Sequence, residues 1–463
     1  MKATELAFAP ALEQAVAIKR REVSSGELVD VYLQRIEELN PRLNAYRLVT
    51  PELARTQAKN PGEGPLAGVP CSVKDLVGLK AHLLTYGSRA FEDNVAQVDY
   101  FMVGRLKDEG CPILGKTTTP EFGSRPTTEH GLHGAARNPW NPEHNTGGSS
   151  GGAAAAVAAG LCAFAHATDG GGSVRIPASW CGCVGLKPSR GRISHGPILA
   201  EGWAGLSTSG VIARTVADAG AGLDAMVGHL PGDPYWAEPE GSYREAARPP
   251  AKPLRVAYTT AGTEVDSEIK AAVDEAVRLI ERHGHHVVGE DGPDTSGLGD
   301  AFLVLFQTAL TTYGIADRSL LEPLNQSALA AAEHLKAADY LAAVNLIRSR
   351  ARQIVAFWDG IDVLVTPTMP ATAPRNGAIP AQDTARTGVW ISQAITFTRP
   401  YNATGQPAIS LPLAMHSNGL PIGVQLVGAP RGEMTILALA AQIEEAQPWR
   451  DRRPPLERLR IHV

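Results

Sequence analysis

Residues 145–175 have the sequence NTGGSSGGAAAAVAAGLCAFAHATDGGGSVR, in which Ser149 and Ser173 each stand beside a run of glycines. An alanine-rich segment and a short apolar run separate the two serines. Glycine lets the backbone approach a neighbouring group closely but loses much conformational entropy on folding, so two such clusters need a reason beyond turn formation. Consecutive glycines also leave backbone N–H groups unshielded, and these can bind an anion or a developing oxyanion. The stretch therefore predicts a catalytic site.

The composition of the whole chain is that of an ordinary soluble protein. Of its 463 residues 44% are hydrophobic and 20% charged, and the net charge is −5. This charge gives no electrostatic reason to bind nucleic acid or an anionic membrane, so we expect a small-molecule substrate. The longest apolar run, 153–167, is too short to span a membrane, and the N-terminus does not resemble a secretory signal. Five cysteines, an odd number, favour a reducing, cytoplasmic compartment.

The order of the expected elements favours an α/β fold. Strands are expected at 111–114, 161–168, 254–258, 286–288, 363–366, 407–412 and 420–427, and helices at 99–110, 266–283 and 434–446. Strands that alternate with helices over such a span predict a sheet covered by helices.

Other segments are expected to be helical or loop-like. A capping box at Ser24 predicts a helix that ends at Asn40-Pro41. Residues 51–64 are polar and predict a loop, whereas residues 300–358 are mostly helical in pattern. Residues 65–73 predict a short extended segment that leads to Lys74. A lysine in this position often extends its amine to water, so a role for Lys74 depends on its neighbours.

Two motifs match sequence patterns that are typical of other functions. Residues 110–117 match the phosphate-loop pattern G-x-x-x-x-G-K-[ST], which requires a strand before the loop and a helix after it. Here a helix precedes, the loop interior is apolar and strand-like, and Pro120 follows closely, so we reject nucleotide binding. Residues 147–151 match the nucleophile elbow G-x-S-x-G, but the preceding residues 138–145 are rich in turn formers.

A Ser-His-Asp esterase is therefore the weaker hydrolase hypothesis. It requires a late histidine, and His229, His334 and His416 carry no recognisable motif. The pair His285-His286 lacks a partner motif for metal binding and is interpreted as an ordinary loop-to-strand junction. Cys181 and Cys183 flank a single glycine, a spacing that favours small buried side chains over a redox or zinc site.

Hydrolysis of a carboxamide would explain the serine pair. The reaction needs a nucleophile, a base, an acid for the leaving amine and donors for the oxyanion. Ser173 can supply the nucleophile, Ser149 can relay a proton, and Lys74 can be the base if it is neutral. With an ordinary pKa near 10.4, only roughly one lysine in 2,500 is neutral at pH 7, so its surroundings must lower that pKa.

Several motifs together resemble the amidase signature family. They are VKD at 73–75, GGSSGG at 147–152, TDGGGSVRIPA at 168–178 and CGCVGLKPS at 181–189, with weaker support from DVLVTPTMP, NATGQPAISLP and GLPIGVQLVG after residue 361. The resemblance implies one α/β/α domain over residues 1–463 around a large mixed sheet, without metal or organic cofactor. Within it we expect an N-terminal helical region at 1–64, a catalytic core at 65–190 and a variable, mostly helical region at 230–355.

The same resemblance implies roles for individual residues. Ser173 would be the acyl-accepting nucleophile, Ser149 the bridging serine and Lys74 the base, and the Gly148-Ser149 peptide would be cis. The backbone N–H groups around Gly170, Gly171, Gly172 and Ser173 would form the oxyanion hole.

Three neighbouring positions complete the comparison of motifs. Asp169 and Arg175 fit the signature, and we expect them to hold the loop in place. Position 170 is glycine where many members have a branched residue, a departure that would loosen the turn and leave the relay intact.

The substrate is the least defined part of the hypothesis. Gly123 occupies a place where family members line the acyl pocket, so its small size predicts room for a bulky acyl group, and Tyr86 is a second candidate for substrate contact. The resemblance implies an amidase acting on linear or cyclic amides, often as a homodimer. A glutaminase subunit of a tRNA-dependent amidotransferase, which works only with partner chains, is the alternative within the family.

Overall fold

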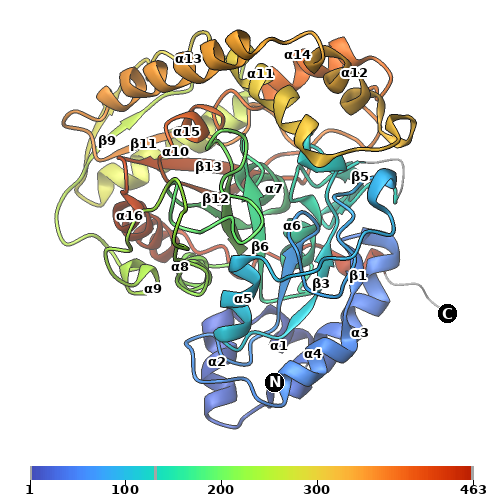
Figure 1. Cartoon of the computed structure of the whole chain (residues 1–463). Helices are drawn as coiled ribbons and strands as arrows, with labels where there is room; N and C mark the ends of the chain where they lie inside the picture. The colour runs from blue at the N-terminus through green and yellow to red at the C-terminus, as the bar shows by residue number, and fades with distance from the viewer. Residues whose placement is uncertain (1–2, 130–132, 460–463) are drawn as a thin grey trace.

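A mixed 11-stranded sheet runs through the molecule (Figure 1). The computed structural model describes residues 3–129 and 133–459. Across the sheet the strands are β1 (Tyr46–Val49), β3 (Ile113–Thr117), β2 (Cys71–Lys74), β6 (Phe164–Asp169), β8 (Thr208–Ala213), β7 (Val184–Lys187), β12 (Ala408–Met415), β13 (Pro421–Gly428), β11 (Val363–Pro367), β9 (Arg255–Tyr258) and β10 (His286–Gly289). A separate hairpin pairs β4 (Arg137–Asn138) with β5 (Asn141–Asn145).

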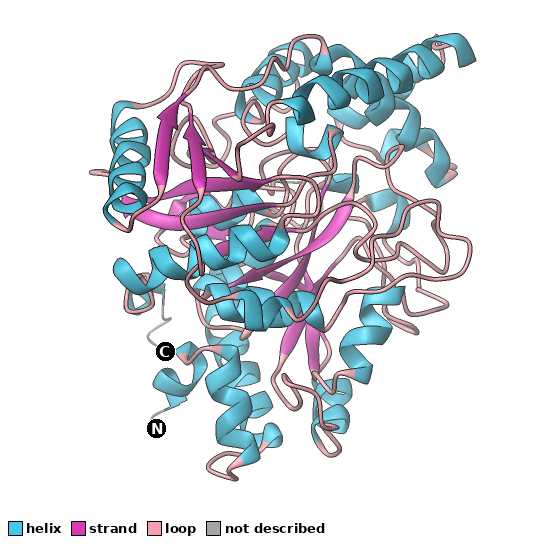
Figure 2. Cartoon of the chain, turned by 90° about the vertical axis from the view of Figure 1, so that its left-hand side faces the viewer, coloured by secondary structure: helices cyan, strands magenta, loops and turns pink. Residues whose placement is uncertain are grey.

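Helices lie on the outside of these strands (Figure 2). The α-helices are α1 (Ala3–Phe8), α2 (Ala11–Lys19), α3 (Ser25–Leu43), α4 (Pro51–Ala58), α5 (Phe101–Asp108), α6 (Gly151–Ala158), α7 (Arg175–Cys181), α8 (Val216–Asp224), α9 (Tyr243–Ala246), α10 (Ser267–Arg282), α11 (Leu298–Leu310), α12 (Pro323–Ala332), α13 (Ala337–Ala356), α14 (Thr384–Ala394), α15 (Pro400–Ala403) and α16 (Glu433–Ala446). Short 3-10 turns lie at Arg89–Phe91, Glu121–Gly123, Thr311–Tyr313, Arg318–Leu320 and Leu456–Leu459. No helix in the described part of the chain is long and apolar enough to cross a membrane.

Parallel pairing fixes where the polar side chains gather. β2 lies between β3 and β6 and is parallel to both. The carboxyl ends of parallel neighbours lie at one edge of a sheet, where ligands of α/β proteins usually bind. Lys74 is the last residue of β2 and Asp169 the last of β6, so both chain segments arrive at this edge.

The alanine-rich segment after Ser149 forms helix α6, which is buried at every residue. A helix that is apolar on all sides belongs in a core, and α6 packs against β2, β3 and β6. Glycines allow this close approach: a Cβ at Gly152 would lie 2.4 Å from the backbone nitrogen of Thr118. The glycines of GGSSGG therefore allow helix α6, which begins two residues after Ser149, to pack closely in the core.

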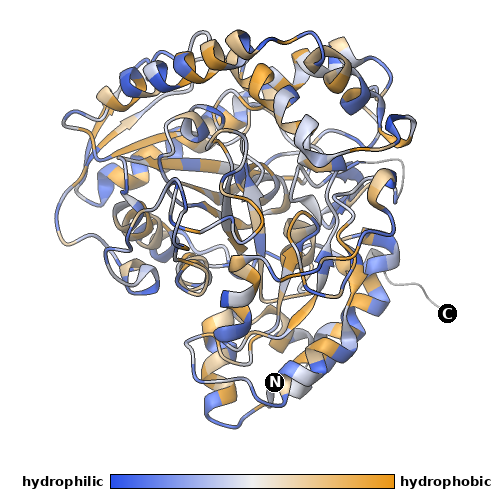
Figure 3. Ribbon diagram, in the orientation of Figure 1, coloured by the Kyte–Doolittle hydropathy of each residue, from blue (hydrophilic) through white to orange (hydrophobic). Residues whose placement is uncertain are grey.

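Most expected strands and helices are confirmed, with three corrections. The capping box at Ser24 is present, but helix α3 continues through Pro41 to Leu43, because Leu39 and Leu43 are both buried. The ribbon of α3 carries both hydrophobic and hydrophilic residues along its length (Figure 3). The segment expected as a loop at 51–64 contains α4, which buries only two alanines and so lacks a visible apolar stripe. The turn-rich residues 138–145 form the β4–β5 hairpin.

Other residues singled out by the sequence have structural surroundings. Cys181 and Cys183 are free and buried. His285 accepts the N–H of Leu254 through Nδ1, and its Nε2 lies 2.6 Å from Gln442 Oε1, so it joins β9 to α16. Within the described residues, no group of three or more His, Cys, Asp or Glu side chains is arranged to hold a metal ion.

The lysine of the apparent phosphate loop is held inside the protein. Residues 113–117 are strand β3, and Lys116 Nζ lies 2.6 Å from Asp75 Oδ1 with both side chains buried. Lys116 Nζ also donates to the carbonyl of Leu83. The backbone geometry of a phosphate loop is therefore absent from these residues, and Lys116 has a structural partner.

We predict that Lys116→Met destabilises the fold by about 3–5 kcal/mol, because it leaves the carboxylate of Asp75 buried without its counter-ion. The measurement is urea unfolding followed by circular dichroism. Lys107→Met is the matched control: Lys107 Nζ is also 2.6 Å from a carboxylate, that of Asp99, but both side chains are about a quarter exposed. This control should lose no more than about 1 kcal/mol. Equal losses would contradict the prediction.

Candidate active site

Lys74 is completely buried at the end of β2 and faces three hydroxyl groups. Its Nζ lies 2.8 Å from Ser149 Oγ, 2.8 Å from Ser150 Oγ and 2.8 Å from Thr168 Oγ1. Burial removes water from the ammonium form and holds the pKa of Lys74 well below its usual value, and the charge of Asp169 opposes this shift only in part. A neutral amine can donate two hydrogen bonds and accept one, so the three hydroxyls satisfy Lys74 in its neutral state.

Hydrogen bonds hold the loop that carries Ser149. Asn145 Oδ1 accepts the N–H groups of Thr128 and Gly147. The hydroxyl of Thr128 donates to the carbonyl of Gly147 and accepts the N–H of Gly151. The Gly148-Ser149 peptide is cis, as the family resemblance implied. Ser149 therefore has a fixed place between this loop and the amine of Lys74.

A buried ion pair holds the loop that carries Ser173. Asp169 accepts the N–H groups of Gly172 and Val174 and both Nε and Nη2 of Arg175. Burial alone would raise the pKa of Asp169, but the charge and hydrogen bonds of Arg175 hold it below its usual range. Asn402 donates to Asp169 from a distant segment. These contacts agree with the expectation that Asp169 and Arg175 hold the loop.

One of the four expected oxyanion donors is already in use. The N–H of Gly172 donates to Asp169 Oδ1 at 2.8 Å, so it points into the loop. Within the described residues, the backbone N–H groups of Gly170, Gly171 and Ser173 have no acceptor. Three amides therefore remain for a ligand beside Ser173.

Two cavities meet at Ser173. We call the first the arginine chamber, because Arg125 and Arg399 line it; its volume is about 570 Å³. We call the second the tyrosine chamber; its volume is about 530 Å³, and its wall includes Tyr86, Tyr100, Tyr313 and Tyr340. Gly123, Ser173 and Trp203 line both chambers, and Ser149 and Thr168 line the tyrosine chamber. Both volumes lie in the range of small-molecule sites.

Helix α11 and Trp203 separate the chambers. Phe302 and Phe306, one turn apart on α11, line the arginine chamber, whereas Leu305 and Ala309 of the same helix line the tyrosine chamber. The ring of Trp203 packs edge-on against Phe302 and Phe306, with centroids 6.1 Å and 5.4 Å apart. Helix α11 packs on α12 and α13, in the layer along the top of Figure 1.

The glycine at position 170 makes room for Trp203. A Cβ on Gly170 would lie 3.0 Å from the Trp203 ring, closer than a relaxed contact. The departure from the family pattern therefore fits the tryptophan that divides the cavities. We expected this glycine to loosen the turn, but the ring of Trp203 packs against it.

The two candidate substrate residues lie at the chambers. Gly123 has φ +68°, and a Cβ there would lie 3.0 Å from Ser149 Oγ and 3.0 Å from Leu76 Cδ1. A larger residue at 123 would therefore displace Ser149 as well as fill the cavity. Tyr86 packs edge-on against Phe91 and Tyr313 in the wall of the tyrosine chamber.

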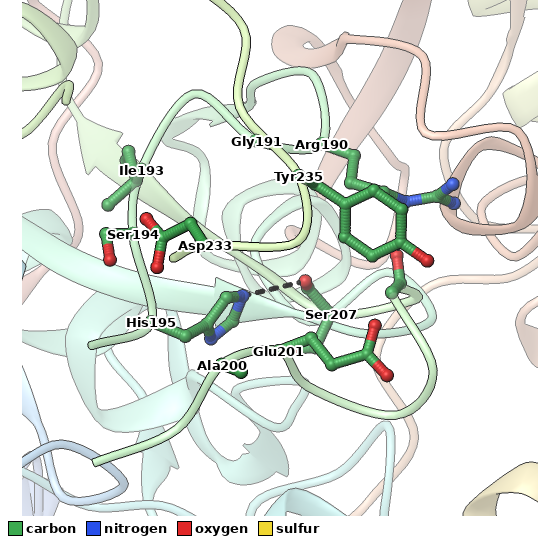
Figure 4. A pocket seen from close by; sticks show the side chains of 11 residues that line it. Arg190, Gly191, Ile193, Ser194, His195, Ala200, Glu201, Ser207, Asp233 and Tyr235 are labelled. Atoms are coloured by element: carbon green, nitrogen blue, oxygen red, sulfur yellow. Dashed lines mark hydrogen bonds between the residues drawn. The ribbon is translucent and has the colours of Figure 1, made fainter. Parts of the chain in front are cut away.

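A small side pocket adjoins the tyrosine chamber (Figure 4). His195, Glu201 and Ser207 line both, but the side pocket holds only about 10 Å³, room for about one water molecule. His195 Nε2 lies 3.1 Å from the carbonyl of Ser207, and burial lowers the pKa of His195. A neutral His195 that donates from Nε2 leaves Nδ1 as an acceptor.

Supporting residues were missed by the sequence analysis. His166 accepts the backbone N–H of Lys74, and burial lowers its pKa to about 3, so it is neutral beside the lysine. Arg175 Nη1 donates to Gln425 Oε1, and Arg175 Nη2 donates to Asn402 Oδ1. Asn402 and Gln425 stand in the weaker family motifs, which was the one signal available. His229, His334 and His416 line neither chamber.

We predict that Gly170→Val lowers kcat/KM about tenfold or more and destabilises the protein by about 1–3 kcal/mol, because its side chain overlaps Trp203. In a double-mutant cycle, the same substitution in a Trp203→Ala background should cost much less. Gly104→Val is the control, since a Cβ at Gly104 meets nothing within 4 Å. Additive effects at positions 170 and 203 would contradict the proposed contact.

Comparison with known proteins agrees with this architecture. A family model described as Amidase matches residues 27–437. The 6-aminohexanoate-cyclic-dimer hydrolase of Paenarthrobacter ureafaciens is 38% identical over 96% of this chain and 96% of that protein. A solved structure of a 6-aminohexanoate cyclic dimer hydrolase superposes with a TM-score of 0.93 at 36% identity, covering 97% of this chain and 99% of that chain.

A bacterial aryl acylamidase of the amidase signature family superposes with a TM-score of 0.87 at 28% identity, covering 96% of this chain and 97% of that chain. The family match, the fold and the relatives extend over nearly the whole chain. The chain therefore belongs to the amidase signature family and is an amidohydrolase that hydrolyses carbon–nitrogen amide bonds.

Proposed function

We propose that Ser173 is the nucleophile of this amidase and that Ser149 and Lys74 relay its proton. Neutral Lys74 accepts the proton of Ser149 while Ser149 accepts that of Ser173, and the Ser173 oxygen forms a bond to the amide carbon. The carbonyl oxygen becomes an oxyanion, which accepts hydrogen bonds from the free amides of Gly170, Gly171 and Ser173.

The relay then runs in reverse. Lys74 returns its proton to Ser149, Ser149 protonates the amide nitrogen, and the carbon–nitrogen bond breaks to release the amine and leave an acyl-enzyme on Ser173. A water molecule, deprotonated through the same relay, attacks the ester and releases the acid. The bond between the acid and Ser173 breaks, and the serine recovers its proton.

One observation carries this proposal: Lys74 is buried against three hydroxyls, with Ser149 among them at 2.8 Å. A lysine that only stabilised the fold would be expected to meet a carboxylate, as Lys116 does with Asp75. The relatives named above are amide hydrolases, and neither is named as a glutaminase subunit. This similarity does not support the glutaminase-subunit alternative. His229, His334 and His416 are not among the residues that line the chambers, which does not support a Ser-His-Asp relay.

The cellular location of the protein is also a proposal. We infer a cytoplasmic location, supported by the five free, buried cysteines, because a reducing compartment keeps thiols unpaired. The substrate is a small-molecule amide, in agreement with two cavities of ligand size.

Active-site labelling tests the serine roles. A fluorophosphonate should modify Ser173, as identified by mass spectrometry of the labelled peptide, and Ser173→Ala should abolish the label and lower kcat by more than about 10⁴-fold. Ser149→Ala should lower kcat by about 10²–10⁴-fold. Ser150→Ala is the matched control, since Ser150 contacts Lys74 at the same distance but lies outside the relay; its loss should be much smaller. Label on Ser149 would overturn the assignment.

The pH dependence tests the role of Lys74. Since only the neutral amine is a base, kcat/KM should rise with pH through the depressed pKa of Lys74 and level off below about pH 10.4. Lys74→Arg stays protonated and should lose about 10²–10⁴-fold in kcat at every pH. The unfolded chain binds this proton more tightly, so the contribution of Lys74 to stability rises with pH from the depressed pKa of the folded state up to the ordinary pKa near 10.4.

Lys187 is the control for this profile, because burial lowers its pKa to about 7 and it too could titrate. Lys187→Met should keep the rising limb if Lys74 is responsible. Loss of the rising limb in Lys187→Met would show that Lys187, and not Lys74, produces the pH dependence.

A further inference from the structure

The two chambers differ in the charges that they present to a substrate. Arg125, Arg399 and Asp300 line the arginine chamber, whereas Glu201 is the one carboxylate among the residues that line the tyrosine chamber. The mechanism proposed above uses neither arginine. Their presence beside Ser173 therefore needs a separate explanation.

Arg125 is a buried cation with few partners. It is 4% exposed, and its Nε and Nη2 are buried without a hydrogen-bond acceptor among the described residues. Glu322 Oε2 lies 3.6 Å from Nη2, close enough for charge attraction but beyond hydrogen-bond distance. A buried N–H donor without an acceptor costs free energy, so each such group needs an explanation, and a ligand that supplies the acceptor is one. A carboxylate in the chamber would supply an acceptor that the protein does not.

Arg399 presents a second guanidinium to the same cavity. Its Nη1 donates to Ser392 Oγ at a long 3.3 Å, and its Nε is buried without an acceptor. The nearby acid is Asp300, whose side chain is exposed and makes no hydrogen bond to Arg399 that meets normal geometry. Arg399 therefore keeps donor capacity for a ligand.

Both arginines are attached to the segments that form the reaction centre. The backbone carbonyl of Arg125 lies against Gly148, next to Ser149, because a Cβ on Gly148 would be 2.7 Å from it. Arg399 follows Thr398, whose hydroxyl donates to the carbonyl of Gly171 at 2.6 Å. An arm of the substrate held by these arginines would be positioned relative to Ser173 by short, fixed connections.

The remaining wall of the arginine chamber is largely apolar. It includes Ile176, Phe302, Leu324, Val389, Ile391 and Ile395. An arm that combines methylene groups with a terminal anion matches this lining. The planar fork of a guanidinium pairs with a carboxylate through two parallel hydrogen bonds, which a neutral terminus cannot form.

We propose that the arginine chamber binds a carboxylate at the end of one arm of the amide substrate, so that the enzyme prefers amides with an anionic terminus. This inference rests on the proposed amidase mechanism and adds the substrate class to it. Arg125 and Arg399 are then specificity-determining residues that bind substrate without taking part in proton transfer.

Two matched series of amides test the proposal. In one, anilides of straight-chain acids end in a carboxylate, a methyl group or an ammonium group; in the other, hexanamides carry the same three termini on the amine arm. In at least one series the carboxylate should raise kcat/KM about 10- to 100-fold over the methyl terminus, and the ammonium should not. Equal values for carboxylate and methyl termini in both series would overturn the proposal.

Variants locate the preference. Arg125→Met and Arg399→Met should each reduce the ratio of carboxylate to methyl kcat/KM by about tenfold or more, and this ratio is the readout because it cancels any loss common to both amides. Arg375→Met is the matched control, since Arg375 is 70% exposed, pairs with Glu143 on the surface and lines neither chamber. A preference that survives both chamber variants would overturn the assignment. If Arg125→Met does not fold, two other measurements test the proposal. They are the effect of Arg399→Met on the same ratio and the inhibition of the wild type by hexanedioate, which should be stronger than inhibition by hexanol.

The series also separates this inference from the mechanism. Hydrolysis of methyl-terminated amides that depends on Ser173, without any gain from a carboxylate, would refute the inference alone. Hydrolysis that persists in Ser173→Ala would refute the proposed mechanism instead.

Discussion

The buried ion pair between Asp169 and Arg175 is the constraint on which the Ser173 loop depends. Both side chains are inaccessible to solvent, so neither charge is tolerable without the other. Asp169 also accepts the N–H of Gly172, and Arg175 donates to Asn402 of α15 and Gln425 of β13, both more than 200 residues away in the sequence. The loop is therefore fixed both by its own residues and by distant C-terminal segments, and the amides that stay free beside Ser173 are those that Asp169 does not bind.

Burial of lysine has two different outcomes in this sheet. Lys74 is the last residue of β2, Lys116 is the next-to-last residue of the neighbouring parallel strand β3, and both are buried. Lys116 meets the carboxylate of Asp75, which favours the charged form, whereas Lys74 meets only hydroxyls, which satisfy a neutral amine equally well. The difference between a structural lysine and a candidate base thus lies in the partner, because both lysines are fully buried near the carboxyl ends of parallel strands.

The accuracy of the sequence analysis followed the strength of the local signal. Helix α10, expected at 266–283, spans Ser267–Arg282, because its apolar residues recur at helical spacing and a capping aspartate begins it. Helix α4 was missed because two buried alanines give no stripe, and α3 passed Pro41 because the burial of Leu43 outweighed the missing N–H. Propensity near a boundary is weak compared with the free energy of burying one leucine.

The sequence by itself determined the candidates for the chemistry: the glycine-flanked serines Ser149 and Ser173, Lys74 at the end of an extended segment, and the motifs that resemble the amidase signature family. Each of these signals is local, because a loop that needs glycine or a strand that needs apolar residues leaves its mark within a few positions. Only the tertiary structure decided that Gly172 binds Asp169, that Gly170 makes room for Trp203, and that α11 divides the space above Ser173 into two chambers. The walls of the arginine chamber come from segments up to 276 residues apart, from Gly123 to Arg399, and contacts over such separations leave no pattern in a single sequence.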